Sequence, residues 1–351
     1  MSIIKKSICF VTETARTERP IQDPSVRYRC YHPAEILSKR GHICAVYAAQ
    51  KFYEDPSFDY DVYVFHRPSM ARANFLKVIS FLRTCGKKLI ADYDDLIFGS
   101  EDIAIISSAV KNNTLTPERA IAAFSSNLAG LRQFDMVTVS TEPLAAKVRE
   151  FNPDARVSVV HNMVPESIFT IQENYKTPFR KRAAGAIGYF AGTKSHDRDF
   201  PVVEAALQRV LSENPAFTLL VVGPVAIPQG IASLPNVSRA PAVSYARLFS
   251  PMSRCSTVIA PLEDSAFNAC KSRVKFLEAA VAGCRLIASP IPDMQIIGSK
   301  HLTCASSLDE WYEALSMQID PHVNAELVSS NFEFLRNSRQ IDGLDSFGEI
   351  E

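Results

Sequence analysis

The sequence predicts an α/β protein made of two Rossmann-like domains that face each other across a cleft. Three observations lead to this prediction. The chain has 351 residues, which is more than one hydrophobic core usually holds. Short apolar runs alternate with helical patterns along most of the chain, as in an open parallel sheet covered by helices. This alternation occurs twice, so each half of the chain can form a sheet of its own.

The first half contains six runs that we expect to be buried parallel strands, because they are rich in β-branched residues and bounded by turn formers. These runs are 7–11, 43–48, 62–65, 88–91, 136–140 and 158–160. Helical patterns lie between them at 33–39, 71–83 and 117–133. The last pattern follows Thr116-Pro117, an N-cap residue and a proline at the first helical position.

The second half repeats the alternation, with expected strands at 186–190, 218–222, 257–260 and 285–288 and expected helices at 200–211, 245–252 and 271–281. Residues 165–185 between the halves lack periodicity and include the basic run 180–182. We therefore predict an N-terminal domain at 1–165, a linker at 166–184 and a C-terminal domain at 185–330. The tail at 331–351 is expected to return to the first domain or to be disordered.

Composition and charge exclude several classes of protein. Lys plus Arg (38) equals Asp plus Glu (38), so no net field attracts nucleic acid or an anionic membrane. No apolar stretch approaches the ~20 residues of a membrane-spanning helix, and the N-terminal apolar run is too short for a signal peptide. The eight cysteines occur singly, which predicts small buried side chains in a reducing compartment. We predict a cytoplasmic protein with at most peripheral contact at the inner membrane face.

Residues 260–290 read as a strand, a polar loop, a helix, a glycine and another strand. Lys271, Lys275 and Glu278 recur at helical spacing and form one stripe. Lys271 and Ser272 are expected in the first helical turn, where free amides and the helix dipole favour an anion such as a diphosphate. Glu278 could then accept hydrogen bonds from ribose hydroxyls. Spacing alone favours a solvated stripe of Lys–Glu pairs instead.

A second candidate loop follows the expected strand at 186–190. Gly192 permits close backbone approach, and Thr193 and Arg198 offer hydrogen-bond donors to a phosphate. The same loop could instead cap the next helix through Asp197 or Asp199.

Two further candidate groups belong to the first half. Asp94 and Asp95 follow the fourth expected strand, together with Asp92, and suggest an acid/base or metal-binding group.

The arginines Arg27 and Arg29 lie in the expected loop after the first strand, and His66 ends another strand. Arginines suit bidentate contact with carboxylate or phosphate, which indicates an anionic ligand. Alternatively, these arginines could pair with acidic neighbours at the surface. His66 could likewise have a structural role.

The segment at 260–290 resembles the nucleotide-sugar site of GT-B glycosyltransferases, particularly family four, which includes many bacterial polysaccharide-assembly enzymes. The similar pattern is a proline after the strand, an asparagine, a Lys-Ser pair, a lysine and a glutamate, carried here by Pro261, Asn268, Lys271, Ser272, Lys275 and Glu278. Glu278 matches the second glutamate of the family's Glu–seven residues–Glu motif, which holds the donor ribose. Cys270 stands at the place of the first glutamate. The loop at 187–200 and the carboxylates at 92–95 are similar to further segments of these enzymes.

The resemblance implies transfer of a sugar from a nucleoside diphosphate sugar to a glycan or lipid-linked acceptor, with retention of anomeric configuration. It implies no cofactor and no metal, because basic groups and helix N-termini neutralise the leaving diphosphate. The implied donor-binding residues, in the C-terminal domain, are Gly192, Thr193, Arg198, Asn268, Lys271, Ser272, Lys275 and Glu278. The implied catalytic residues are Asp94, Asp95 and Lys271, and the implied acceptor contacts are Arg27, Arg29 and His66.

Several alternatives stay open at this point. A GT-A glycosyltransferase would place a Mn²⁺-binding Asp-x-Asp at about this depth, but the second βαβ half argues against it. A haloacid-dehalogenase phosphatase needs a small residue or threonine where Leu96 stands. A GT-B epimerase acting on the nucleotide-sugar is a further alternative. Because Cys270 stands where the family has its first glutamate, the chain could also be a non-catalytic partner in a polysaccharide-assembly complex.

Overall fold

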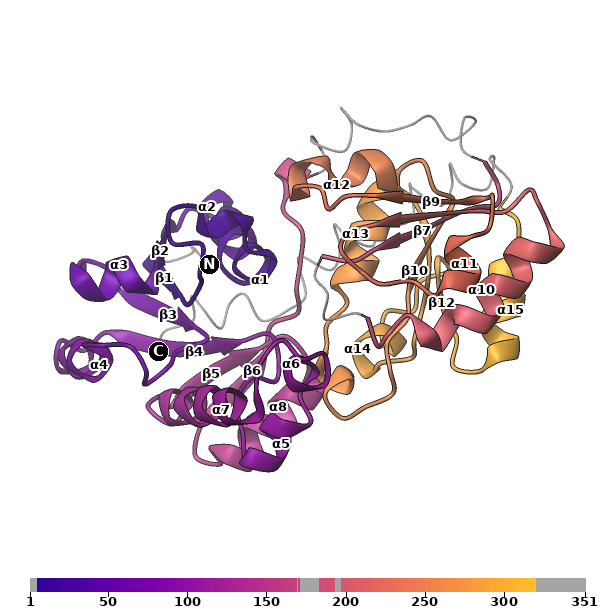
Figure 1. Cartoon of the computed structure of the whole chain (residues 1–351). Coiled ribbons are helices and arrows are strands. Elements are labelled where there is room, and N and C mark those ends of the chain that lie inside the picture. Colours follow the sequence, from indigo (N-terminus) through magenta and orange to yellow (C-terminus); the bar gives the residue numbers. More distant parts are fainter. Residues whose placement is uncertain (1–4, 169, 171–182, 193–196, 320–351) are drawn as a thin grey trace. The chain divides into compact units, whose positions relative to one another are not determined.

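The computed structural model describes residues 5–168, 170, 183–192 and 197–319. The described residues form two compact units, one running through Pro165 and including Cys270–Ser272, the other comprising the remainder. Each unit contains a six-stranded parallel sheet with helices packed against it (Figure 1). The predicted α/β class with two parallel sheets is confirmed. Most of the predicted linker and the whole predicted tail lie outside the described residues.

The sheet of the first unit has the strand order β2-β1-β3-β4-β5-β6. Its strands are β1 (Ser7–Thr12), β2 (Ile43–Ala48), β3 (Val62–His66), β4 (Lys88–Tyr93), β5 (Met136–Val139) and β6 (Arg156–Val159). Strand β1 pairs in parallel with both β2 and β3, and Thr12 lies opposite His66 in the β1–β3 register. The carboxyl ends of these central strands therefore meet at one edge of the sheet.

The helical elements of the first unit are η1 (Pro20–Gln22), α1 (Pro24–Val26), η2 (Arg27–Tyr31), α2 (His32–Lys39), α3 (Ala49–Glu54), α4 (Phe75–Thr84), α5 (Glu101–Ile105), α6 (Ser108–Lys111), α7 (Pro117–Leu131) and α8 (Glu142–Phe151). Thr116 caps α7 as expected, accepting a hydrogen bond from the Arg119 amide. Asp23 caps α1 in the same way. The segment that we expected to be a loop is therefore helical from Pro24 onward.

The sheet of the second unit has the order β12-β11-β10-β7-β8-β9. Its strands are β7 (Ala186–Phe190), β8 (Thr218–Val222), β9 (Val237–Ala240), β10 (Thr257–Ala260), β11 (Arg285–Ala288) and β12 (Leu302–Cys304). The four strands expected in this half are confirmed at the predicted residues. The two edge strands, β9 and β12, escaped prediction because they are short and only partly buried, and so lack a continuous apolar run.

The helical elements of the second unit are α10 (Pro201–Glu213), α11 (Gln229–Ala232), α12 (Tyr245–Met252), η5 (Asn268–Cys270), α13 (Val274–Ala282), α14 (Pro292–Gln295) and α15 (Leu308–Ser316). Helix α13 begins at Val274 with Arg273 as its N-cap residue. The prediction that Lys271 and Ser272 lie in its first turn is therefore wrong. Both residues precede the helix, so the expected stripe with Lys275 and Glu278 does not extend to Lys271.

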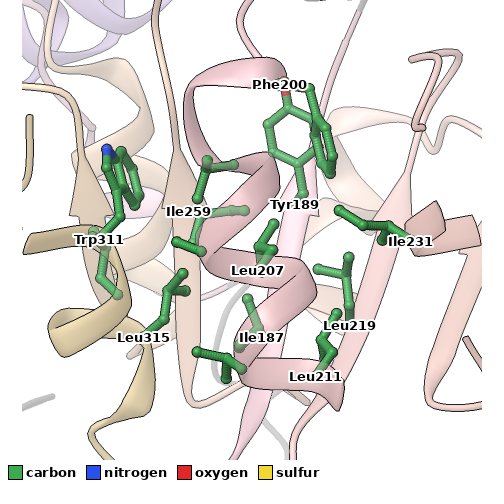
Figure 2. Packing of buried hydrophobic residues seen from close by; sticks show 14 of the residues in the cluster. Ile187, Tyr189, Phe200, Leu207, Leu211, Leu219, Ile231, Ile259, Trp311 and Leu315 are labelled. Carbon is green, nitrogen blue, oxygen red and sulfur yellow. The ribbon is translucent and has the colours of Figure 1, made fainter. Parts of the chain in front are cut away.

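Each unit has its own hydrophobic core. In the first unit, buried residues of β1, β3 and β4 pack against α1, η2 and α2. In the second, α10 and α15 cover one face of the sheet, and the buried indole of Trp311 on α15 completes that layer (Figure 2). Five of the eight cysteines are buried, as expected, and all eight are free thiols. No helix in the described part of the chain is long and apolar enough to cross a bilayer.

Gly223, directly after β8, provides a test of the second sheet. Its φ is +118°, and a Cβ added there would lie 1.8 Å from the carbonyl oxygen of Ala191. Gly223→Ala should destabilise the protein by at least about 2 kcal/mol, because both the backbone conformation and the overlap disfavour a side chain. Thermal unfolding measures this loss. Gly192→Ala is the matched control, since nothing lies within 4 Å of the added Cβ; equal losses in both variants would contradict this arrangement.

Candidate functional site

Both sheets contain a topological switch point, where the strand order reverses along the chain. In the first sheet it lies between β1 and β3, and in the second between β7 and β10. Ligands of open parallel sheets bind at the carboxyl ends of the strands beside such points. Most of the predicted site residues follow strands at these two edges. We therefore describe one candidate site in each unit.

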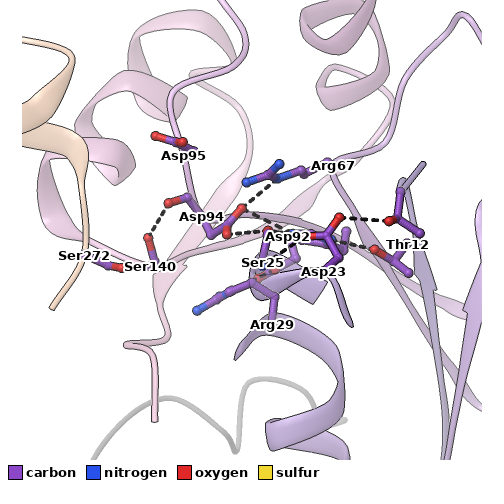
Figure 3. A network of polar contacts seen from close by, with 12 residues as sticks. Thr12, Asp23, Ser25, Arg29, Arg67, Asp92, Asp94, Asp95, Ser140 and Ser272 are labelled. Carbon is purple, nitrogen blue, oxygen red and sulfur yellow. Dashed lines mark hydrogen bonds and ion pairs between the residues drawn. The ribbon is translucent and has the colours of Figure 1, made fainter. Parts of the chain in front are cut away.

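The site of the first unit centres on the carboxylate of Asp94, just after β4 (Figure 3). Its Oδ1 accepts hydrogen bonds from Arg67 Nε at 2.8 Å and from His66 Nε2 at 3.2 Å. Its Oδ2 accepts a hydrogen bond from Ser25 Oγ at 2.5 Å. The other ring nitrogen of His66, Nδ1, lies 2.7 Å from Thr12 Oγ1. Three strand ends and the start of α1 thus converge on one carboxylate.

The Asp94 carboxylate is held in its ionised form. Burial alone would raise the pKa of Asp94, but the Arg67 guanidinium and the hydrogen bond from His66 outweigh burial and hold it well below its usual range. A carboxylate in this state is a poor proton acceptor at neutral pH. Asp94 therefore fits an electrostatic or positioning role better than a general-base role.

Arg67 adopts a strained backbone conformation beside this carboxylate. Its φ is +57°, in the left-handed region that non-glycine residues rarely adopt. The surroundings fix this conformation: the Arg67 amide donates to the carbonyl of Asp92 at 2.8 Å, and the Tyr93 hydroxyl donates to the carbonyl of Pro68 at 2.8 Å. A Cβ on Gly130 would lie 2.5 Å from the same Pro68 oxygen, so α7 packs directly against this turn.

Arg29 forms a buried ion pair with Asp92 rather than an exposed contact. Its Nε and Nη2 donate to the two carboxylate oxygens of Asp92 at 2.9 and 2.6 Å, and Nη1 donates to Val160 O and to Asn162 Oδ1. The side chains of Arg29 and Asp92 are 1% and 0% exposed. The prediction that Arg29 contacts an acceptor is therefore wrong, because its donors are used inside the unit.

The other two predicted acceptor contacts also differ from expectation. Arg27 is buried in the helical turn η2 instead of standing in an open loop. His66 is 1% exposed, and both of its ring nitrogens are occupied by groups of its own unit. His66 thus supports Asp94 from the inside and presents no surface to an acceptor.

In the second unit, Asp199 joins the two loops of the switch point. Its Oδ1 accepts hydrogen bonds from the Glu263 amide at 3.0 Å and from Asn268 Nδ2 at 3.3 Å. Asn268 Nδ2 also donates to the carbonyl of Glu263 at 2.9 Å. Both Asp199 and Asn268 are buried. The predicted donor-binding residue Asn268 therefore holds the loop after β10 in shape. Arg198 is more exposed and lies 3.6 Å from a carboxylate oxygen of Glu263.

Lys275 and Glu278 on helix α13 form an ion pair in which one side chain is much more exposed than the other. Lys275 Nζ lies 2.8 Å from Glu278 Oε2, and the two side chains are 30% and 7% exposed. The start of the helix is fixed by Arg273, whose guanidinium and amide donate to the buried carboxylate of Asp293. Glu278 is thus a nearly buried carboxylate on a fixed helix, and not part of a solvated stripe.

The residues just before α13 belong by their contacts to the first unit. Asn162 Nδ2 donates to Ser272 Oγ at 2.8 Å, and Thr141 Oγ1 donates to the carbonyl of Cys270 at 3.0 Å. Lys271 is partly buried between them. Burial raises the pKa of the Cys270 thiol to about 11. Cys270 is therefore neutral at physiological pH and cannot supply the negative charge of a glutamate.

The remaining predicted donor residues lie in the loop after β7. Gly192 is exposed, with open space where a Cβ would be, so the structure gives no packing reason for a glycine there. Thr193 lies outside the described residues. Among the described residues, no group of three or more His, Cys, Asp and Glu side chains is arranged to hold a metal ion.

Several residues of these sites were not predicted from the sequence. The sequence did not single out Ser25, and it offered Asp199 only as an alternative helix cap. The Arg273–Asp293 pair spans 20 positions of the chain. Arg67 belongs to the segment at the end of a strand, with His66 and Pro68, that the sequence marks as a candidate. No sequence signal indicated its positive φ.

No family model and no curated protein sequence matches the chain. Solved structures do match it. An alpha-glucosyltransferase in complex with UDP aligns with a TM-score of 0.66 and 11% identity over 98% of each chain. HepE of Anabaena, in complex with UDP and glucose, aligns with a TM-score of 0.55 and 12% identity, covering 98% of this chain and 97% of HepE.

A trehalose-phosphate synthase from Burkholderia xenovorans, in complex with glucose-6-phosphate, aligns with a TM-score of 0.54 and 13% identity over 82% of this chain and 73% of its own. The alpha-glucosyltransferase was also solved with UDP and a 13-mer DNA, where the TM-score is 0.63. At these identities the likeness shows the fold. The chain has the GT-B fold of these glycosyltransferases.

The ionised state of Asp94 predicts a pH dependence of stability. Its folded pKa lies below the ordinary value of 3.8, so its contribution is complete above that value and is lost as pH falls through the folded pKa. Asp94→Asn should therefore lose stability less steeply than wild type below about pH 4, by at most about 1.4 kcal/mol per pH unit. Urea unfolding between pH 6 and 3 measures both slopes. Equal slopes would contradict the assignment.

Proposed function

We propose that this protein is a glycosyltransferase that moves a sugar from a nucleoside diphosphate sugar to a glycan or lipid-linked acceptor. The observation that carries the proposal is the alignment of both sheets, over 98% of the chain, with enzymes solved in complex with UDP. Fold alone hosts many functions, so the proposal also needs suitable residues at the switch points.

The second unit offers groups suited to the donor nucleotide. Glu278, nearly buried and next to Lys275, can accept hydrogen bonds from ribose hydroxyls if Lys275 moves aside. Arg198 follows β7 at the carboxyl edge of the second sheet, where a diphosphate would meet positive charge. Lys271 and Ser272 precede α13 and belong by their contacts to the first unit, so the donor contacts that the resemblance implies for them stay a prediction.

Charge pairing supports a mechanism without a metal or other cofactor. Asp92 is neutralised by Arg29 and Asp94 by Arg67, so two of the three carboxylates at the end of β4 already have cationic partners. A divalent cation would have to compete with both guanidinium groups. In the proposed reaction, basic side chains and backbone amides stabilise the leaving diphosphate instead.

The finer assignment follows the resemblance to family-four enzymes of surface polysaccharide assembly. It comprises transfer with retention of configuration, by a cytoplasmic enzyme with at most peripheral contact at the inner membrane face. The balance of 38 basic and 38 acidic residues favours a glycan or lipid-linked acceptor over nucleic acid. The buried neutral Cys270 means that sugar hydroxyls are held by other groups.

The proposal predicts that a nucleoside diphosphate stabilises the protein without a metal. UDP, GDP, CDP, dTDP and ADP are tested one at a time, with EDTA present, by thermal shift. One of them should raise the melting temperature, because a ligand that binds only the folded state adds RT ln(1 + [L]/Kd) to stability. The shift should be much smaller in Glu278→Gln.

Glu213→Gln is the matched control, because Glu213 is an exposed carboxylate of the same unit with a side chain that is 51% exposed. It should bind the nucleotide like wild type. A shift that appears only after Mn²⁺ is added would contradict the metal-independent mechanism. No shift with any of the five nucleotides, with or without metal, would contradict the proposed function.

A further inference from the structure

Two adjacent carboxylates at the end of β4, Asp94 and Asp95, differ sharply in how fully they are bonded. The Asp94 side chain is 11% exposed, and both of its oxygens accept hydrogen bonds, from Arg67, His66 and Ser25. Its backbone carbonyl also accepts a hydrogen bond, from Ser140 Oγ at 3.0 Å. The hydrogen-bonding capacity of Asp94 is therefore largely used within its own unit.

Asp95 is the carboxylate that retains open capacity. Within the described residues its side chain has one hydrogen bond, in which Oδ1 accepts from the Leu96 amide at 3.2 Å. Its Oδ2 has no hydrogen bond there, and the residue is partly exposed. In Figure 3 several dashed lines meet at Asp94, while none reaches Asp95. A carboxylate accepts about four hydrogen bonds, so Asp95 can take up several more.

The strained backbone of Arg67 is explained by the support that its side chain gives to the turn after β4, which carries Asp94 and Asp95. Its left-handed conformation is held by the Asp92 carbonyl and by the packing of Pro68 against Gly130, and it directs Nε to Asp94. Strain that the surroundings enforce is typical of sites that must be rigid before a ligand arrives. Burial lowers the pKa of Arg67, and the charges of Asp94 and then of Asp95 raise it. The Asp95 carboxylate is therefore close enough to interact electrostatically with the Arg67 guanidinium.

We propose that Asp95 is the residue of the first unit that contacts the substrate, by accepting a hydrogen bond from a sugar hydroxyl, and that Asp94, Arg67 and His66 are positioning residues. Arg67 and His66 fix Asp94, and Asp94 fixes the turn that presents Asp95. This inference rests on the proposed function and deepens it. The ligand chemistry is a polyhydroxyl compound, since a carboxylate bonded only to one backbone amide accepts strong hydrogen bonds from hydroxyl donors.

The opposing explanation is that Asp95 only stabilises its turn. Its Oδ1 bonds the Leu96 amide and its carbonyl accepts from the Ile97 amide at 3.0 Å, which is a common local arrangement of aspartate. Asn retains the side-chain oxygen for such a turn but has no charge. Asp95→Asn therefore separates the two explanations, and Asp94→Asn is its isosteric neighbour.

The experiment measures release of UDP from UDP-glucose, or of the corresponding nucleotide from whichever nucleotide sugar binds, with p-nitrophenyl glycosides or water as acceptor. Asp95→Asn should lower kcat/KM about 10- to 100-fold, the effect expected when a charged hydrogen bond to substrate is lost. Its melting temperature and its affinity for the nucleotide should stay those of wild type. Asp94→Asn should lower the melting temperature.

Arg67→Gly tests the positioning role, because glycine accepts the positive φ while the side chain with its guanidinium is removed. Without Arg67 the pKa of Asp94 should rise, so the acid limb of the pH–rate profile should move to higher pH. A residue needed only for folding would lower the amount of active protein without moving that limb.

Three results overturn the inference while leaving the proposed function intact. The first is turnover by Asp95→Asn within twofold of wild type, and the second is a melting temperature of Asp95→Asn as low as that of Asp94→Asn. The third is a pH–rate profile of Arg67→Gly whose acid limb has not moved. A wild-type protein that binds no nucleotide and releases none would instead remove the proposed function, and the inference with it.

Discussion

The buried ion pair between Arg29 and Asp92 is the interaction on which the first candidate site depends. Arg29 reaches from the helical turn η2 to the end of β4 and, through Nη1, to Val160 and Asn162 beyond β6. Asp92 also accepts a hydrogen bond from Thr138 on β5. Four segments that are far apart in the chain are thereby fixed at one sheet edge. Loss of either partner would leave an uncompensated buried charge, which is strongly unfavourable.

The two units use the same design at their switch points. In each, a carboxylate joins the loops that leave neighbouring strands: the largely buried Asp94 receives groups from the segments after β1 and β3, and the buried Asp199 receives groups from the loop after β10. These carboxylates hold the loops, and we propose that Asp95 and Arg198 beside them contact the ligand. Rigid support behind accessible polar groups is what substrate positioning requires.

The sequence sufficed for most of the fold, but not for the contacts that the candidate site residues make. Buried parallel strands are visible as apolar runs, which is why all four predicted strands of the second half were confirmed, whereas the partly buried edge strands were missed. Residue types at strand ends singled out Asp94 and His66, which the structure brings into hydrogen-bond contact at the carboxyl edge of the first sheet. Which partner each side chain finds, such as Asp92 for Arg29, depends on contacts across more than 60 positions, which local patterns do not encode.

The central claim is that the second unit holds the nucleotide-sugar site. Its most direct test is amide hydrogen exchange of the whole protein with and without the nucleoside diphosphate that binds. A nucleotide-sugar site in the second unit predicts slower exchange in the loops after β7 and β10 and at the start of α13, where Asp199 and Asn268 join the switch point. Protection confined to the carboxyl edge of the first sheet, or absent from the second unit at saturating nucleotide, would contradict it.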